Sequence, residues 1–189
     1  MKKTVLAVLF LMSAAVVFGQ NWSLDKGHAK LGFGITHMMV SDVEGTFRSF
    51  DAKIVSSKED FSDAVIELSA DVNTIDTDNE QRDEHLRKPD FFDVAKYPTL
   101  TFKSKSIKKI ADKKYKVAGD LTLHGVTKPV ELEVTLRGTT VHPYNKKTVA
   151  GFKASGVIKR SDFAIATSTP AAMLSDDVAI TANAEFVKE

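Results

Sequence analysis

The chain has 189 residues, of which 26 are basic, 25 are acidic and none is cysteine. This near-neutral charge gives no electrostatic basis for binding nucleic acid or an anionic membrane surface, so neither is predicted as a partner. Without cysteine the chain has no disulfides and no thiolate chemistry, so its hydrophobic core must hold the fold together.

Residues 1–19 have the features of a secretory signal peptide. Lys2 and Lys3 precede an apolar stretch, residues 4–18, that is shorter than the roughly 20 residues a membrane-spanning helix needs. We expect cleavage before Gln20 and export of a single domain, residues 20–189. Loss of the two lysines leaves 24 basic and 25 acidic residues, a net charge of −1. The rest of the sequence contains no integral membrane span.

The first half of the exported domain alternates apolar and polar residues with a period of two. A turn is predicted at Asp25–Gly27, followed by strands over residues 31–35 and 64–72. Such alternation is typical of strands that have one apolar face and one face in water. It therefore favours an antiparallel sheet.

One segment in the middle of the chain departs from this alternation. Thr77 and Glu80 have the spacing of a capping box, which predicts a short helix over Asp78–Arg87. Phe91 and Phe92 follow the helix as a pair of aromatic side chains. A single helix with an aromatic tail, set between strands, most simply covers one opening of a barrel.

The second half of the chain returns to the period of two. Its clearest strand is Val130–Leu136, where Val and Leu alternate with Glu and Thr, and further strands are predicted over residues 115–123, 149–160 and 178–187. Gly, Pro and Asn punctuate these strands and predict turns. The predicted turns are Gly125 (with His124), Lys128–Pro129, Gly138 and His142–Asn145.

No constellation in the sequence is typical of a catalytic or metal site. The five histidines lack the spacing of a zinc or iron site, so neither a metal nor a cofactor is predicted. Ser161 and Asp162 lie outside any Gly-x-Ser-x-Gly elbow, and no glycine-rich phosphate loop occurs. We therefore predict that the protein is not an enzyme.

Arg82, Asp83 and His85 are the candidates for an enzymatic alternative. Histidine titrates near neutral pH and can act as an acid or base. Neighbouring helical residues do not face each other, however, so Arg82 and Asp83 should bond other partners. We favour a role in tying the helix to the strands by charge-assisted hydrogen bonds.

Many large aromatic residues must be accommodated inside such a barrel. Phe33, Phe47, Phe92, Phe102 and Phe152 are among twelve phenylalanines. They could fill a solid core, giving a structural or partner-binding domain, or they could surround a ligand. Periodicity does not distinguish a filled barrel from a hollow one.

Several motifs, taken in order, resemble the YceI-like family over nearly the whole exported domain. They open with Trp22–His28, Phe33–Val40 and Val43–Phe47. The later motifs are Thr74–Thr77, Arg82–Leu86, Asp90–Asp93 with Tyr97–Pro98, Gly119–Val130 and Arg160–Phe163. Two positions depart from the family pattern. Ala29 stands where serine is common, and Ala164 stands where glycine is common, which could narrow a cavity.

The resemblance implies an all-β fold, an extended lipocalin-like antiparallel β-barrel of about eight strands in the bacterial periplasm. Members of the family bind polyisoprenoids or related long-chain amphiphiles inside the barrel. The predicted partner is therefore a long-chain isoprenoid or fatty amphiphile, held for sequestration, transport or storage. The sequence leaves monomer and homodimer both open.

The residues predicted to bind this ligand are the large apolar side chains on the faces assumed to point inward. They are Phe33, Ile35, Phe47, Ile66, Leu68, Phe92, Phe102, Leu121, Leu123, Val134 and Phe152.

Overall fold

A computed structural model describes residues 19–189, so the predicted signal peptide lies outside the described residues except for Gly19. The strands are β1 (Gln20–His37), β2 (Ser41–Phe47), β3 (Phe50–Ser56), β4 (Val65–Asp71), β5 (Ile75–Asp76), β6 (Thr99–Ala111), β7 (Lys114–Leu123), β8 (Val126–Val141), β9 (Thr148–Lys159) and β10 (Leu174–Lys188). One α-helix, α1 (Glu80–Leu86), and two 3-10 turns, η1 (Val72–Thr74) and η2 (Arg160–Phe163), complete the described part.

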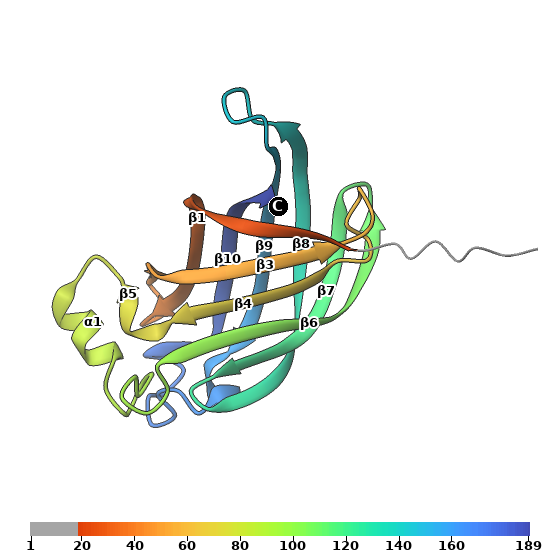
Figure 1. Cartoon of the computed structure of the whole chain (residues 1–189). Helices are drawn as coiled ribbons and strands as arrows, with labels where there is room; N and C mark the ends of the chain where they lie inside the picture. Colours follow the sequence, from red (N-terminus) through yellow and green to blue (C-terminus); the bar gives the residue numbers. More distant parts are fainter. Residues whose placement is uncertain (1–18) are drawn as a thin grey trace, which may run out of the picture.

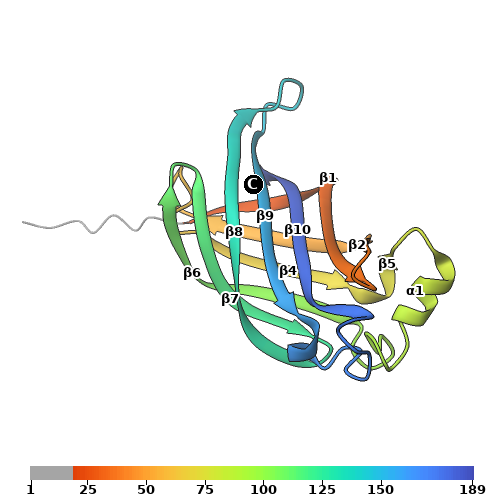
Figure 2. The ribbon, with the colours of Figure 1, turned by 180° about the vertical axis from the view of Figure 1, so that it is seen from behind.

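Eight strands form a closed antiparallel ring. Their order is β1, β3, β4, β6, β7, β8, β9 and β10, and β10 pairs with β1 to close the ring. The rear view in Figure 2 shows β10 between β9 and β1. Strands β2 and β5 extend the sheet beside the second half of β1. The predicted barrel of about eight antiparallel strands is therefore confirmed.

Strand β1 is much longer than predicted, because Asp25–Gly27 forms a bulge and not a turn. The pairing with β10 is regular up to Asp25 and resumes at Ala29. Residues 20–23 pair with β3, whereas residues 31–37 pair with β2. The bulge thus bends one continuous strand so that it serves two neighbours, a common role of bulges in closed sheets.

Two other predicted turns also lie inside a strand, β8. Lys128 and Pro129 pair with β7, and β9 does not pair with β8 before Glu133. Pro129 is tolerated because this stretch of β8 has a free edge. Gly138 marks a bulge between β8 and β9. The predicted turn at His142–Asn145 does connect β8 to β9.

The turn at His124 and Gly125 is confirmed as the hairpin between β7 and β8. Leu123 pairs with Val126, so the loop has two residues, and both have positive φ angles of 51° and 73°. These angles are typical of the tight hairpin turn that glycine favours. The Tyr97 ring packs against Gly125, where an added Cβ would lie 2.8 Å from the ring carbon Cζ.

The helix is shorter than the predicted Asp78–Arg87, and the predicted capping box is wrong. The cap is Asn79, whose side chain accepts a hydrogen bond from the Arg82 amide at 3.0 Å. Asn79 can do this because Asp78 has a φ of 58° and redirects the chain. Thr77 instead bonds to Asp83. Figure 1 shows α1 beside β5 at one end of the barrel.

Candidate ligand-binding cavity

The barrel is hollow. A cavity of about 590 Å³ lies inside it, lined by inward side chains from β1, β2, β3, β4, β6, β7, β8, β9 and β10 and by the segment around α1. Its volume is within the range of about 300–1,000 Å³ that is usual for small-molecule sites. The alternative of a solidly filled barrel is therefore wrong for this chain.

The structure brings all the predicted binding residues to the wall of this cavity. Those on strands do so because side chains alternate across a strand and the apolar set faces inward. The cavity-lining residues that the sequence predicted are Phe33, Ile35, Phe47, Ile66, Leu68, Phe92, Phe102, Leu121, Leu123, Val134 and Phe152. Their contact with a ligand stays a prediction.

Small residues on β9 and β10 contribute to the space inside the barrel. Ala154, Ala182 and Ala184 line the cavity, next to Val178 and Ile180 on the same inward faces. Both strands are predicted from the sequence, but these small residues are not among the predicted binding residues, which are all large apolar side chains. The period-two pattern alone would have identified them.

One end of the barrel is closed by packed aromatic rings. Phe61, in the loop between β3 and β4, lies with its ring centroid 5.0 Å from Trp22 and 5.0 Å from Phe152. Phe152 in turn packs against Phe186 at 5.8 Å. Phe61 is 2% exposed although it is in a loop. These four rings form an aromatic plug, which was not predicted because Phe61 belongs to no alternating pattern.

The opposite end of the cavity is covered by α1 and the residues that follow it. Phe92 packs edge-on against Phe47 with 6.1 Å between the ring centroids, and the centroids of Phe47 and Phe33 are 5.8 Å apart. The ring centroids of Phe91 and His85 are 4.8 Å apart. The loop between β9 and β10 lies at the same end, where Thr169 and Met173 also line the cavity (Figure 1).

A hydrogen-bond network joins α1 to the segment that leads into it from β5. Asp83, which is buried, accepts hydrogen bonds from the Thr77 amide at 2.9 Å and the Thr77 hydroxyl at 2.6 Å. Arg82 donates to the same hydroxyl at 2.7 Å and to the Thr77 carbonyl at 2.6 Å. Arg82 and Asp83 thus both bond Thr77, which lies in the connection between β5 and α1 and not on a strand. These bonds fix the chain that leads into the helix, so the predicted direct tie from these two residues to the strands is wrong.

His85 takes no part in that network. Its Nε2 atom lies 3.3 Å from the carboxylate of Asp90, and both side chains are more than half exposed. Arg82, His85 and Asp90 all border the cavity, so this end presents polar groups beside an apolar interior. The structure therefore does not join Arg82, Asp83 and His85 into one acid–base group.

Arg160 organises the loop between β9 and β10. It is 5% exposed, and its guanidinium donates hydrogen bonds to five main-chain carbonyls. The acceptors are Ile165, Ala166, Thr169, Leu174 and Ser175. A buried arginine satisfied in this way fixes the loop that borders the cavity.

Ser161 in η2 is joined by hydrogen bonds to Asp176 at the start of β10, and Ala164 directly follows η2. The Asp176 carboxylate accepts hydrogen bonds from the Ser161 hydroxyl at 2.9 Å and the Ser161 amide at 3.0 Å, and these bonds lower its pKa. Ala164 is exposed, has a φ of 56° and does not line the cavity. The expectation that Ala164 could narrow the cavity is therefore wrong.

Comparison with known proteins agrees with this architecture. The family model described as YceI-like domain matches residues 22–186 of this chain. The chain belongs to the YceI-like family. Protein YceI of Escherichia coli O157:H7 is 40% identical over 172 residues, which cover 88% of this chain and 89% of that protein.

Solved structures of similar proteins have the same fold. The Campylobacter jejuni YCEI protein superposes with a TM-score of 0.74 at 36% identity, covering 88% of this chain and 96% of the other. A polyisoprenoid binding domain from Saccharophagus degradans has a TM-score of 0.65 at 16% identity, covering 89% and 98%. Within residues 19–189, no helix is long and apolar enough to cross a membrane.

Proposed function

We propose that the protein binds one long-chain isoprenoid or related amphiphilic lipid inside its barrel. The observation that carries this proposal is the apolar cavity of about 590 Å³, closed at one end by aromatic rings. Its wall is built from aliphatic and aromatic side chains, which suits a hydrocarbon tail and offers little to a polar molecule. The S. degradans domain described as polyisoprenoid-binding has the same fold, which supports this class of ligand.

Burial of the tail would supply the binding free energy. Each buried CH₂ contributes roughly 0.8 kcal/mol, so a tail of about 20 carbons provides more than about 10 kcal/mol before costs. Ordering the tail and losing its free translation offset much of this gain. Because apolar burial is not directional, selectivity should follow the length and width of the cavity.

The polar head of the ligand would stay at the end covered by α1. A head group that remains near water avoids the cost of burying polar atoms. Arg82, His85 and Asp90 border the cavity there and could donate or accept hydrogen bonds. We assign these residues to head-group contact and the predicted apolar set to the tail.

The protein would act as a carrier or store and not as an enzyme. We propose that residues 1–19 direct export to the periplasm, where residues 20–189 fold as one domain and sequester, transport or store the lipid. A barrel that covers the tail would keep it out of water in that compartment. No observation favours a reaction at His85, whose imidazole pairs with Asp90 and not with Asp83.

The test is organic extraction of the purified protein followed by mass spectrometry. We expect one class of long-chain lipid at close to one molecule per chain. Ala182→Phe, which adds a ring to the cavity wall, should remove most of the lipid. Ala179→Phe, on the outer face of the same strand, should leave the lipid unchanged. Repeated absence of any long-chain species from the wild-type protein would refute the proposal.

A further inference from the structure

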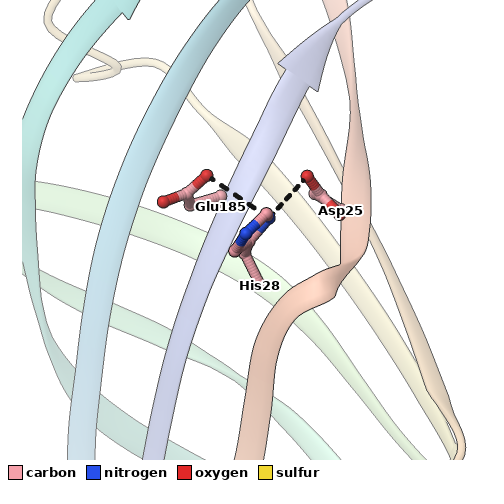
Figure 3. Close-up of side chains that lie close together, drawn as sticks. All are labelled: Asp25, His28 and Glu185. Atoms are coloured by element: carbon pink, nitrogen blue, oxygen red, sulfur yellow. Dashed lines mark hydrogen bonds and ion pairs between the residues drawn. The ribbon is translucent and has the colours of Figure 1, made fainter. Parts of the chain in front are cut away.

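A histidine and two carboxylates meet on the outside of the barrel, away from the cavity. Asp25 and His28 come from β1, and Glu185 comes from β10 (Figure 3). The His28 Nδ1 atom lies 3.0 Å from Asp25 Oδ2 and 3.9 Å from Glu185 Oε2. The three side chains are 33%, 66% and 47% exposed, in the order Asp25, His28 and Glu185, so solvent can reach them.

The strand pairing and the bulge together explain why these residues meet. Asp25 and Glu185 are direct partners in the register of β1 and β10. The irregularity that begins after Asp25 places His28 beside both carboxylates. The sequence predicted no such group, because Glu185 is far from the other two residues along the chain.

A positive charge close to both carboxylates would stabilise the pairing of Asp25 with Glu185. Two like charges opposite each other on neighbouring strands are unfavourable. Among the described residues, His28 is the basic side chain that forms an ion pair with either carboxylate, and it can serve both only when protonated. Lys26, the nearest lysine in the sequence, pairs with Asp51 at 2.9 Å. A bound cation would balance these charges while His28 is neutral.

We propose that Asp25, His28 and Glu185 form a surface site for a divalent transition-metal ion, of which zinc fits best. Imidazole and carboxylate are common zinc ligands, whereas calcium and magnesium prefer oxygen ligands alone. Ligand atoms about 2.0–2.2 Å from one ion lie within roughly 4.4 Å of each other. The three ligand atoms here all lie within 4.8 Å, so small side-chain rotations complete the site. Water fills the remaining coordination positions.

The surroundings already orient one ligand for this role. The Gly27 amide donates a hydrogen bond to Asp25 Oδ1 at 3.0 Å, which leaves Oδ2 facing His28. Such a bond to the second oxygen of a ligating carboxylate is typical of metal sites. Because β1 and β10 are the strands that close the ring, the bound ion would cross-link the barrel at its closure, next to the bulge.

The experiment is zinc titration of the metal-free full-length mature protein by calorimetry, together with thermal melts in ZnCl₂, MgCl₂ and CaCl₂. We expect one zinc ion per chain and a Tm that rises with zinc, since the ion binds the folded state in preference to the unfolded one. Magnesium and calcium should leave the Tm unchanged. Glu185→Gln and His28→Gln should each weaken zinc binding at least about tenfold.

Two substitutions away from the proposed site serve as controls for zinc binding elsewhere. His142→Ala removes an imidazole in the β8–β9 loop, and Glu67→Gln removes a carboxylate on β4. Both should bind zinc as the wild type does. Metal-free melts of all four variants check that the fold is intact. The proposal is overturned if zinc does not bind stoichiometrically, or if Glu185→Gln and His28→Gln bind it with wild-type affinity.

Discussion

The phenolic hydroxyl of Tyr115 on β7 donates a hydrogen bond to the main-chain carbonyl of Asp60, which lies 55 residues earlier. Tyr115 is 1% exposed, so the bond lies inside the protein. Asp60 also forms an ion pair with Lys109 on β6 at 3.0 Å. These contacts fix the β3–β4 loop over the end of the barrel, and the same loop carries Phe61 into the aromatic plug.

Removal of the Tyr115 hydroxyl should therefore destabilise the closed end of the barrel. We expect Tyr115→Phe to lower the free energy of unfolding by about 1 kcal/mol, because the Asp60 carbonyl loses its partner while the ring stays in place. Urea unfolding measures this loss. The control is Tyr144→Phe, whose side chain is 89% exposed and should show no change. Equal stability of both variants would contradict the assigned role of the bond.

Asp63 should make the stability of the same loop dependent on pH. Burial works to raise the pKa of Asp63, but hydrogen bonds from Ser56, Ser57 and Lys58 outweigh it and hold the pKa far below its usual value. Because the folded state has the lower pKa, the carboxylate stabilises the fold above about pH 4, and this contribution is lost as the pH falls further.

The variant Asp63→Asn should remove that pH dependence. We expect a loss of roughly 1–2 kcal/mol at pH 7 and a flatter decline of stability between pH 5 and pH 2. Urea unfolding at a series of pH values measures both. Glu59→Gln, at an exposed position in the same loop, should behave as the wild type. A curve for Asp63→Asn that runs parallel to that of the wild type would show the assignment to be wrong.

Asp83 should be essential for holding α1 over the cavity. Asp83→Ala leaves the buried Thr77 amide and hydroxyl without their acceptor, which should cost roughly 2–4 kcal/mol. Hydrogen exchange of the α1 amides should accelerate more than exchange in β7. Glu84→Ala changes the next, exposed residue of the helix and should have little effect. Unchanged exchange in α1 of Asp83→Ala would count against this role.

Ala164 should be a site where substitution stabilises the protein. Its φ of 56° is in the left-handed region, which glycine adopts without strain. Ala164→Gly should raise the free energy of unfolding by about 0.5–1 kcal/mol, after the greater flexibility of glycine in the unfolded chain is subtracted. Thermal or urea unfolding shows whether Ala164→Gly raises or lowers the stability. Ala179→Gly, in the middle of β10, should instead lower stability.

The parts of the fold that depend on local alternation could be predicted from the sequence. The strand around Val130–Leu136 and the hairpin at Gly125 follow from side-chain period and turn preference, and both are present. The predicted turns at Gly27, Pro129 and Gly138 are wrong, because glycine and proline also occur at bulges and free edges inside strands. Only the pairing partners distinguish these cases.

The residues of the candidate sites also differ in how far the sequence alone predicts them. Phe102 and Leu121 were expected to face the interior, and both line the cavity, since inward orientation follows from alternation and apolarity. Phe61 was not predicted, because its burial depends on a loop that Tyr115 holds in place. The contact of His28 with Glu185 depends on the register between the first and last strands, which no local pattern encodes.

The aromatic plug formed by Trp22, Phe61, Phe152 and Phe186 closes the end of the barrel opposite α1. If the proposed lipid enters at the α1 end, its tail would not pass out through the plugged end and would leave by the route it came. Loading and release of the proposed lipid would then use the same opening. If the protein carries the proposed lipid, a membrane or protein that receives it would dock at the same face as the one that supplied it.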